Sequence, residues 1–254
     1  MFVSMSLVIL TKALAPPYLV TLIQLSKFLE FVIRMEDPIM LDIQGLSVNI
    51  GSTPILRNVS LSVDAGSMCG LIGRNGAGKT TLLRSVMGLL PSSGGSIEFN
   101  RDNLQTEADY RRAHLGIGYM PEDRRLVPTL TAEENILLPV WATSTDGSVQ
   151  RLSWIYDLMP EVAEFRLRHA SALSGGQQKL VALARALMIG NRVLLLDEPT
   201  EGIAPILAKR MLDVLRDLKN EGLSVLVAES NDTHLTGLLD QLYVIERGNV
   251  TTAH

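Results

Sequence analysis

The chain has 254 residues, a formal net charge of −4 and a hydrophobic content of 46%. Because it contains no basic stretch that could neutralise phosphates, the sequence argues against a nucleic-acid partner. Its single cysteine, Cys69, excludes an intramolecular disulfide and a thiolate metal cluster, and we expect this residue to be a buried filler. The length and composition predict one sizeable hydrophobic core with room for two subdomains.

Residues 1–39 differ from the rest of the chain, and we expect them to lie outside the fold. Residues 1–11 and 13–26 carry no charge, but Lys12 separates them. Neither approaches the roughly 20 apolar residues that a membrane-spanning helix requires. We expect translation to begin at one of the two later methionines, Met35 or Met40. The alternative is a helix that lies on a membrane or contacts a partner.

Alternating apolar residues predict two strands, at residues 41–50 and 59–63. A period of two with polar residues between is typical of half-buried, antiparallel strands. A turn at residues 64–66 then leads into residues 68–72, a continuous apolar run that predicts a fully buried central strand.

Residues 73–80 fit the pattern G-x-x-x-x-G-K-[ST], directly after this strand and before helical spacing over residues 80–90. In this context the pattern binds phosphate, because consecutive backbone N–H groups and a helix N-terminus can face one anion. We expect Lys79 to reach the β- and γ-phosphates of a nucleotide and the Thr80 hydroxyl to hold Mg²⁺. The predicted nucleotide-binding residues here are Gly73, Arg74, Asn75, Gly76, Ala77, Gly78, Lys79, Thr80 and Thr81.

Residues 193–198 are four aliphatic residues followed by two carboxylates. Isolated charges at the end of a buried strand are costly, which favours a functional site over a structural one. We expect Asp197 to face the magnesium ion and Glu198 to face the attacking water. The alternative is that both are solvated loop acids.

Residues 173–177 read Leu-Ser-Gly-Gly-Gln, with Ser174 as a good helix N-cap before an apolar helix face. Two glycines directly after the cap would weaken a purely structural helix by about 0.5–1 kcal/mol each. Their use is close backbone approach to an anion at the positive end of the helix. The predicted anion-binding residues are Ser174, Gly175, Gly176 and Gln177.

These three strings resemble the Walker A, signature and Walker B motifs of the ATP-binding cassette ATPases. The resemblance implies an α/β fold over residues 40–254, with a P-loop NTPase core and a mixed sheet, an antiparallel β subdomain and an inserted α-helical subdomain at about residues 121–188. It implies hydrolysis of ATP with Mg²⁺, with Lys79 and Glu198 as catalytic residues. It also implies that two subunits pair head to tail, with ATP between the phosphate loop of one and the signature helix of the other.

Residues 118–125, 130–135 and 198–205 look like the ATPase of high-affinity branched-chain amino-acid importers. That resemblance implies a peripheral subunit on the cytoplasmic face of the inner or plasma membrane. Its partners would be separate permease subunits, a second ATP-binding subunit of the same or a sister chain and, indirectly, a periplasmic substrate-binding protein. Related subunits serve urea, short amides and other amino acids. The alternatives are an exporter's ATPase and a non-transport cassette ATPase.

Within the expected helical subdomain, Thr131 and Glu134 predict a capping box for a helix at residues 135–138 that Pro139 ends. Residues 123–125 could form a solvated, charged turn. The resemblance instead implies that this segment senses the nucleotide and contacts the membrane partner. A second helix is expected to end at Pro160. Two tryptophans, Trp141 and Trp154, are expected to pack within the subdomain rather than to serve as ligand platforms.

Four positions depart from the commonest family pattern. Ile50 stands where an aromatic residue stacks on adenine, and Ala204 stands where an aspartate is common. Glu122 replaces a glutamine, and we still expect it to contact the nucleotide and Mg²⁺. Ser230 replaces a histidine, and two interpretations stay open. It is an N-cap with a solvent-facing His234, or one of these two side chains partly replaces the missing γ-phosphate sensor.

Overall fold

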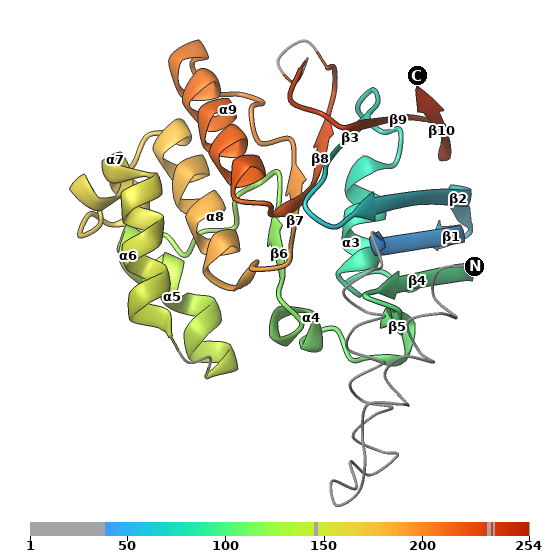
Figure 1. Cartoon of the computed structure of the whole chain (residues 1–254), viewed down its shortest axis with the longest axis horizontal. Coiled ribbons are helices and arrows are strands. Elements are labelled where there is room, and N and C mark those ends of the chain that lie inside the picture. Colours follow the sequence, from blue (N-terminus) through green and yellow to red (C-terminus); the bar gives the residue numbers. More distant parts are fainter. Residues whose placement is uncertain (1–38, 145–146, 233–234, 236, 254) are drawn as a thin grey trace, which may run out of the picture. The chain divides into compact units, whose positions relative to one another are not determined.

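The computed structural model describes residues 39–144, 147–232, 235 and 237–253 (Figure 1). Ile39–His254 form one compact unit. The predicted N-terminal extension and His234 lie outside the described residues. Within those that are described, no helix is long and apolar enough to cross a membrane.

The predicted antiparallel β subdomain is present. Its four strands lie in the order β2-β1-β4-β5. Their bounds are β1 (Ile39–Ile50), β2 (Thr53–Asp64), β4 (Gly94–Phe99) and β5 (Asp102–Asn103). The apolar residues that alternate along β1 and β2 are buried, as expected for strands with one face on a core.

A second sheet of six strands carries the site. Its order is β10-β9-β3-β8-β7-β6, and all neighbours are parallel except β10, which pairs antiparallel with β9. The bounds are β3 (Met68–Ile72), β6 (Ile117–Met120), β7 (Val193–Asp197), β8 (Ser224–Glu229), β9 (Gln241–Glu246) and β10 (Asn249–Ala253). The predicted central strand, β3, therefore lies in the interior of a mixed sheet.

Helices cover both faces of the six-stranded sheet. Figure 1 shows α3 beside the antiparallel strands, and α5 to α9 on the other side. The longer helices are α3 (Lys79–Val86), α5 (Ala132–Thr143), α6 (Ser148–Leu158), α8 (Gly175–Ile189) and α9 (Pro205–Asn220). Shorter turns are η1 (Leu104–Thr106), α4 (Arg111–His114), α7 (Pro160–Glu164) and η2 (Ala170–Ala172).

Strand β7 shows how the core positions the site. Leu194 and Leu196 pack with the helical subdomain, whereas Val193 and Leu195 pack with α3 and the antiparallel strands. All four are 0% exposed, so this strand is anchored on both faces. Asp197 ends it, and its carboxylate is therefore delivered at a fixed place on the carboxyl edge of the sheet.

Two predictions about helices were wrong. The capping box of Thr131 and Glu134 is present, but α5 continues through Pro139 to Thr143. A proline inside a helix costs one backbone hydrogen bond. Burial of Ala132 and Ile136 against the helical core outweighs that loss. Helix α3 ends at Val86, four residues before the end of the predicted helical spacing.

The two tryptophans differ. Trp154 packs partly against the helical core, lies under the Arg151 guanidinium at 4.0 Å and donates to Glu221 Oε1 at 3.3 Å. Trp141 is 55% exposed, so the prediction that it packs within the subdomain was wrong. It follows Val140, which faces the core, and adjacent helical residues point in different directions.

Candidate nucleotide-binding site

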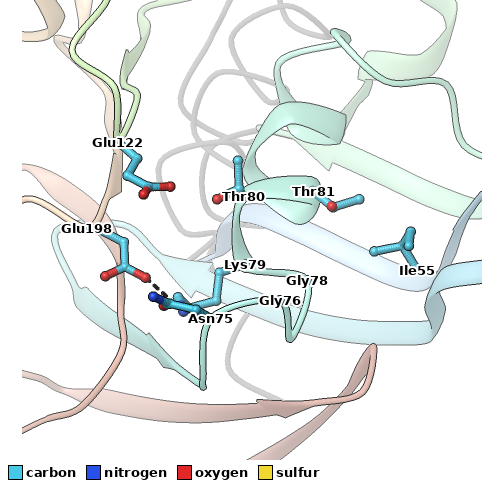
Figure 2. Close-up of a pocket in the computed structure, with 9 residues that line it drawn as sticks. All are labelled: Ile55, Asn75, Gly76, Gly78, Lys79, Thr80, Thr81, Glu122 and Glu198. Carbon is cyan, nitrogen blue, oxygen red and sulfur yellow. Dashed lines mark ion pairs between the residues drawn. The ribbon is translucent and has the colours of Figure 1, made fainter. Parts of the chain in front are cut away.

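A pocket of about 310 Å³ lies where the glycine-rich loop, the start of α3 and the segments after β6 and β7 meet. Figure 2 shows Lys79 and Glu198 joined by an ion pair on one side of the pocket, with Glu122 on the side of Thr80 and Ile55 beyond Thr81. Its lining residues are Ile55, Asn75, Gly76, Gly78, Lys79, Thr80, Thr81, Glu122 and Glu198. Seven of these nine residues were predicted as nucleotide-binding residues, and Glu198 as catalytic.

The loop of residues 73–78 wraps the N-terminus of α3. Gly78 is the helix N-cap with a φ of 116°, a conformation that strongly favours glycine. At its other end the loop is tied to β8, because the Gly73 N–H donates to the Glu229 carbonyl at 3.1 Å. Gly73, Arg74 and Ala77 belong to the loop but do not line the pocket.

Lys79 and Glu198 form a buried ion pair. Their Nζ and Oε1 atoms are 2.9 Å apart, and both side chains are 4% exposed. Lys79 also donates to the Gly73 carbonyl. Burial acts to raise the pKa of Glu198, but hydrogen bonds from Lys79 and Ser230 outweigh it and hold the pKa below its ordinary value. Glu198 is therefore ionised and tethered at neutral pH.

Ser230 lies against the carboxylate of Glu198. Its hydroxyl oxygen is 3.0 Å from Glu198 Oε1, 2.9 Å from Oε2 and 2.9 Å from Asn75 Oδ1. Strand β8 ends at Glu229, and residues 231–232 are not helical, so the N-cap interpretation of Ser230 was wrong. The structure thus brings Ser230 to the predicted catalytic carboxylate and leaves its part in sensing phosphate as a hypothesis.

Asp197 lies beside Thr80. The Thr80 hydroxyl donates to Asp197 Oδ1 at 3.2 Å, and the Tyr119 hydroxyl is 3.4 Å from Oδ2. Burial raises the pKa of Asp197 to about 6, with a smaller contribution from the charge of Glu122, while the hydrogen bond from Thr80 opposes the shift. Among the described residues, no cationic side chain is a main cause of this shift or forms an ion pair with the Asp197 carboxylate.

These oxygen atoms fit a magnesium ion that arrives with a nucleotide. No group of three or more acidic, histidine or cysteine side chains suited to a metal occurs among the residues described. Mg²⁺ does not need one, since it is usually held by one or two protein oxygens together with phosphates and water. Thr80, Asp197 and Glu122, which lines the same pocket, are the residues that could hold it.

The signature residues lie elsewhere in the chain's own fold. Ser174 caps α8 in a capping box with Gln177, as predicted. None of the four residues Ser174, Gly175, Gly176 and Gln177 lines the pocket. Gly176 also has a packing reason that the sequence did not reveal, because a Cβ atom there would lie 2.1 Å from Leu207 Cδ1 of α9.

The charged segment after Glu122 is not merely a solvated turn. Arg185 of α8 donates to the carbonyls of Arg124 and Arg125, and Arg124 donates to Gln178 Oε1 at 2.8 Å. These hydrogen bonds connect the segment after Glu122, at the edge of the pocket, to α8, the helix that begins at the signature residues. Sequence reasoning missed them because the partners are distant in the chain.

Sequence reasoning also missed two other residues, one that lines the pocket and one that interacts with Glu198. Ile55 lines the pocket, whereas Ile50, at the expected adenine position, is 51% exposed and does not. Glu201 was not singled out, although its hydrogen bond with Glu198 raises the pKa of Glu201. Nothing in the local sequence pattern distinguishes these residues from ordinary strand and loop positions.

Comparison with known proteins identifies the family. The family model described as "ABC transporter" matches residues 56–201, which is more than half of the chain. The chain belongs to the ABC transporter ATPases. It is 34% identical over 211 residues to the high-affinity branched-chain amino acid transport ATP-binding protein BraG of Pseudomonas aeruginosa, covering 83% of this chain and 91% of that protein. It is 31% identical over 198 residues to the lipopolysaccharide export system ATP-binding protein LptB of Escherichia coli, with coverages of 77% and 82%.

Solved structures agree with this assignment. A nucleotide-free ATP-binding cassette from an ABC transporter superimposes with a TM-score of 0.74 at 26% identity, covering 85% of this chain and 91% of that one. An ATP-binding cassette of an ABC transporter in its ADP conformation superimposes with a TM-score of 0.73 at 27% identity, covering 84% of this chain and 89% of that one. The predicted fold class is confirmed, and this ABC protein is an ATPase subunit of a transporter that binds and hydrolyses ATP.

Proposed function

We propose that this ABC ATPase energises an importer for branched-chain amino acids or related amino acids and amides. The observation that carries the proposal is its similarity to BraG over 91% of that protein, together with the three importer-like strings of the sequence. An exporter is the second candidate, since LptB is similar over a comparable length.

In the proposed reaction the glycine-rich loop holds the phosphates of ATP. Lys79 neutralises charge on the β- and γ-phosphates from its buried position beside the loop carbonyls. Thr80 and Asp197 would hold Mg²⁺, with Glu122 at the edge of the same pocket. When bound, the ion neutralises charge that develops on the transferred phosphoryl group. Glu198 orients the attacking water or accepts its proton.

The ion pair of Lys79 and Glu198 indicates the order in which phosphate binding and activation of water occur. A γ-phosphate competes with Glu198 for the Lys79 ammonium, because both are anions on the same buried cation. Once Lys79 turns to phosphate, the carboxylate of Glu198 is free to accept from water. Ser230 keeps its contact with Glu198 and so preserves the direction of the carboxylate.

The signature residues Ser174, Gly175, Gly176 and Gln177 serve a second ATP-binding subunit, of the same or a sister chain. Their position outside the chain's own pocket supports this assignment, because their N-terminal N–H groups then remain for a partner's ATP. Permease subunits bind at the membrane, which places the chain on its cytoplasmic face. A periplasmic substrate-binding protein delivers the cargo, and nucleic acid has no part.

The test is reconstitution of the chain with the permease subunits that co-purify with it. We expect ATP hydrolysis that rises when a binding protein loaded with leucine, isoleucine or valine is added. Lys79→Ala is the matched negative control, since it removes the cation on the phosphates. Stimulation by short amides or urea would narrow the substrate to those compounds. Stimulation by a cargo presented from the cytoplasmic leaflet, with none from a loaded binding protein, would contradict import and support an exporter.

A further inference from the structure

A second buried lysine lies behind Glu198. Lys179, in the second turn of α8, is 2% exposed. Its Nζ donates a hydrogen bond to the backbone carbonyl of Glu198. Nothing in the reaction described above uses this residue, although it contacts the backbone of the proposed catalytic carboxylate.

The backbone of Glu198 is in a conformation that needs support. Its φ is 51°, in the left-handed region that residues other than glycine rarely adopt. The Glu198 N–H donates to the Ala228 carbonyl at 2.9 Å, so β8 holds one side of the residue. Lys179 holds the other side through the carbonyl. Such a conformation persists only where the surroundings over-determine it.

The chain segment after Glu198 is fixed in the same region. The carboxylate of Glu229, itself buried, accepts from the Thr200 N–H at 2.9 Å and from its hydroxyl at 2.7 Å. The negative charge of Glu229 also favours the charged form of Lys179, whereas burial lowers the pKa of Lys179 overall. Lys179 and Glu229, from two different elements, therefore support Glu198 and Thr200, which lie two residues apart in one loop.

A purely packing role explains Lys179 poorly. Its neighbours in α8, such as Leu180 and Leu183, are buried and apolar. Burying an ammonium group is costly unless it is hydrogen-bonded, so a residue of similar volume without charge would serve packing better. The position makes sense if the hydrogen bond to Glu198 is what the site requires.

We propose that Lys179 is a positioning residue for Glu198, and that through it α8 controls the orientation of the catalytic carboxylate. The inference rests on the proposed role of Glu198.

The test replaces Lys179 with methionine, which keeps the length and removes the donor, and with arginine, which keeps a cationic donor. Leu183→Met, a fully buried change in the same helix away from Glu198, controls for packing. Four quantities are measured: kcat, the dissociation constant for ATP without Mg²⁺, the melting temperature, and hydrogen exchange at the Glu198 and Thr200 amides.

For Lys179→Met we expect kcat to fall about tenfold or more, as for loss of a hydrogen bond from a charged group. ATP affinity stays at the parent value. Exchange accelerates at Glu198 and Thr200 but not along β7. Arginine restores most of kcat, and Leu183→Met matches the parent in kcat and in exchange.

Parental kcat and parental exchange in Lys179→Met would overturn the inference. If that variant does not fold, Lys179→Arg decides: a folded arginine variant without turnover, whose exchange at Glu198 and Thr200 equals that of the parent, also overturns it. A parent protein without ATPase activity would refute the proposed function instead, and the exchange measurement would still test whether Lys179 holds Glu198.

Discussion

Replacing Ser230 with alanine removes the hydroxyl that lies 2.9 and 3.0 Å from the two carboxylate oxygens of Glu198. A hydroxyl carries one proton, so it donates to only one of these oxygens at a time. A hydrogen bond to a charged group contributes about 1.5–3 kcal/mol. Because Ser230 is only partly buried, water recovers some of this, and we expect a net loss of about 1–1.5 kcal/mol. That corresponds to a fall in kcat of roughly 5- to 12-fold.

The assay is steady-state ATP hydrolysis at saturating MgATP, with ATP binding measured separately. The affinity for ATP should stay near the parental value, since Lys79 and the loop are unchanged. Ser230→Thr is the matched control, because it keeps the hydroxyl. A kcat for Ser230→Ala within twofold of the parent would refute the reasoning. So would equal losses in the alanine and threonine variants.

Because burial raises the pKa of Asp197 to about 6, this group's contribution to stability is full at pH values below its ordinary pKa and is lost as the pH rises to about 6. Without Mg²⁺, Asp197→Asn should therefore be more stable than the parent at pH 7, by on the order of 2–3 kcal/mol in urea denaturation. If the free energy of unfolding depended on pH in the same way in the variant and in the parent, this prediction would be contradicted. Gly118→Ala should lower the free energy of unfolding by about 2 kcal/mol, since its Cβ would meet the Ala186 carbonyl at 2.4 Å, whereas Gly94→Ala, with its nearest atom at 3.9 Å, should lower it by much less. Lys79→Ala should lose ATP affinity itself in a binding titration, and parental affinity would argue against the phosphate-loop assignment.

Much of the fold could be predicted because its determinants are local. The alternation along β1 and β2 reports burial of one face, and the unbroken apolar runs of β3 and β7 report burial of two. The capping boxes at Thr131 and Ser174 are signals spanning four residues. The glycine-rich loop was predictable for the same reason, since strand, loop and helix are consecutive.

What the sequence did not reveal depends on contacts between distant segments. Pro139 sits inside α5 because the helix face packs on a core that no local rule reports. Ser230 reaches Glu198 from the residue after β8 and Lys179 from α8, and each looks ordinary in its own segment. Ile55 lines the pocket only because the antiparallel sheet brings β2 to the glycine-rich loop. The contacts of Ser230, Lys179 and Ile55 with the site can be recognised only when the arrangement of β8, α8 and β2 in space is known.

The central claim is that Glu198 acts on the attacking water of ATP hydrolysis. The direct measurement is ATP turnover by Glu198→Gln, together with size exclusion in the presence of ATP. Glutamine keeps the shape of the side chain but cannot accept a proton from water. We predict that the variant binds ATP, forms a stable ATP-bound dimer and does not turn over. Hydrolysis at a rate near that of the parent would contradict the account.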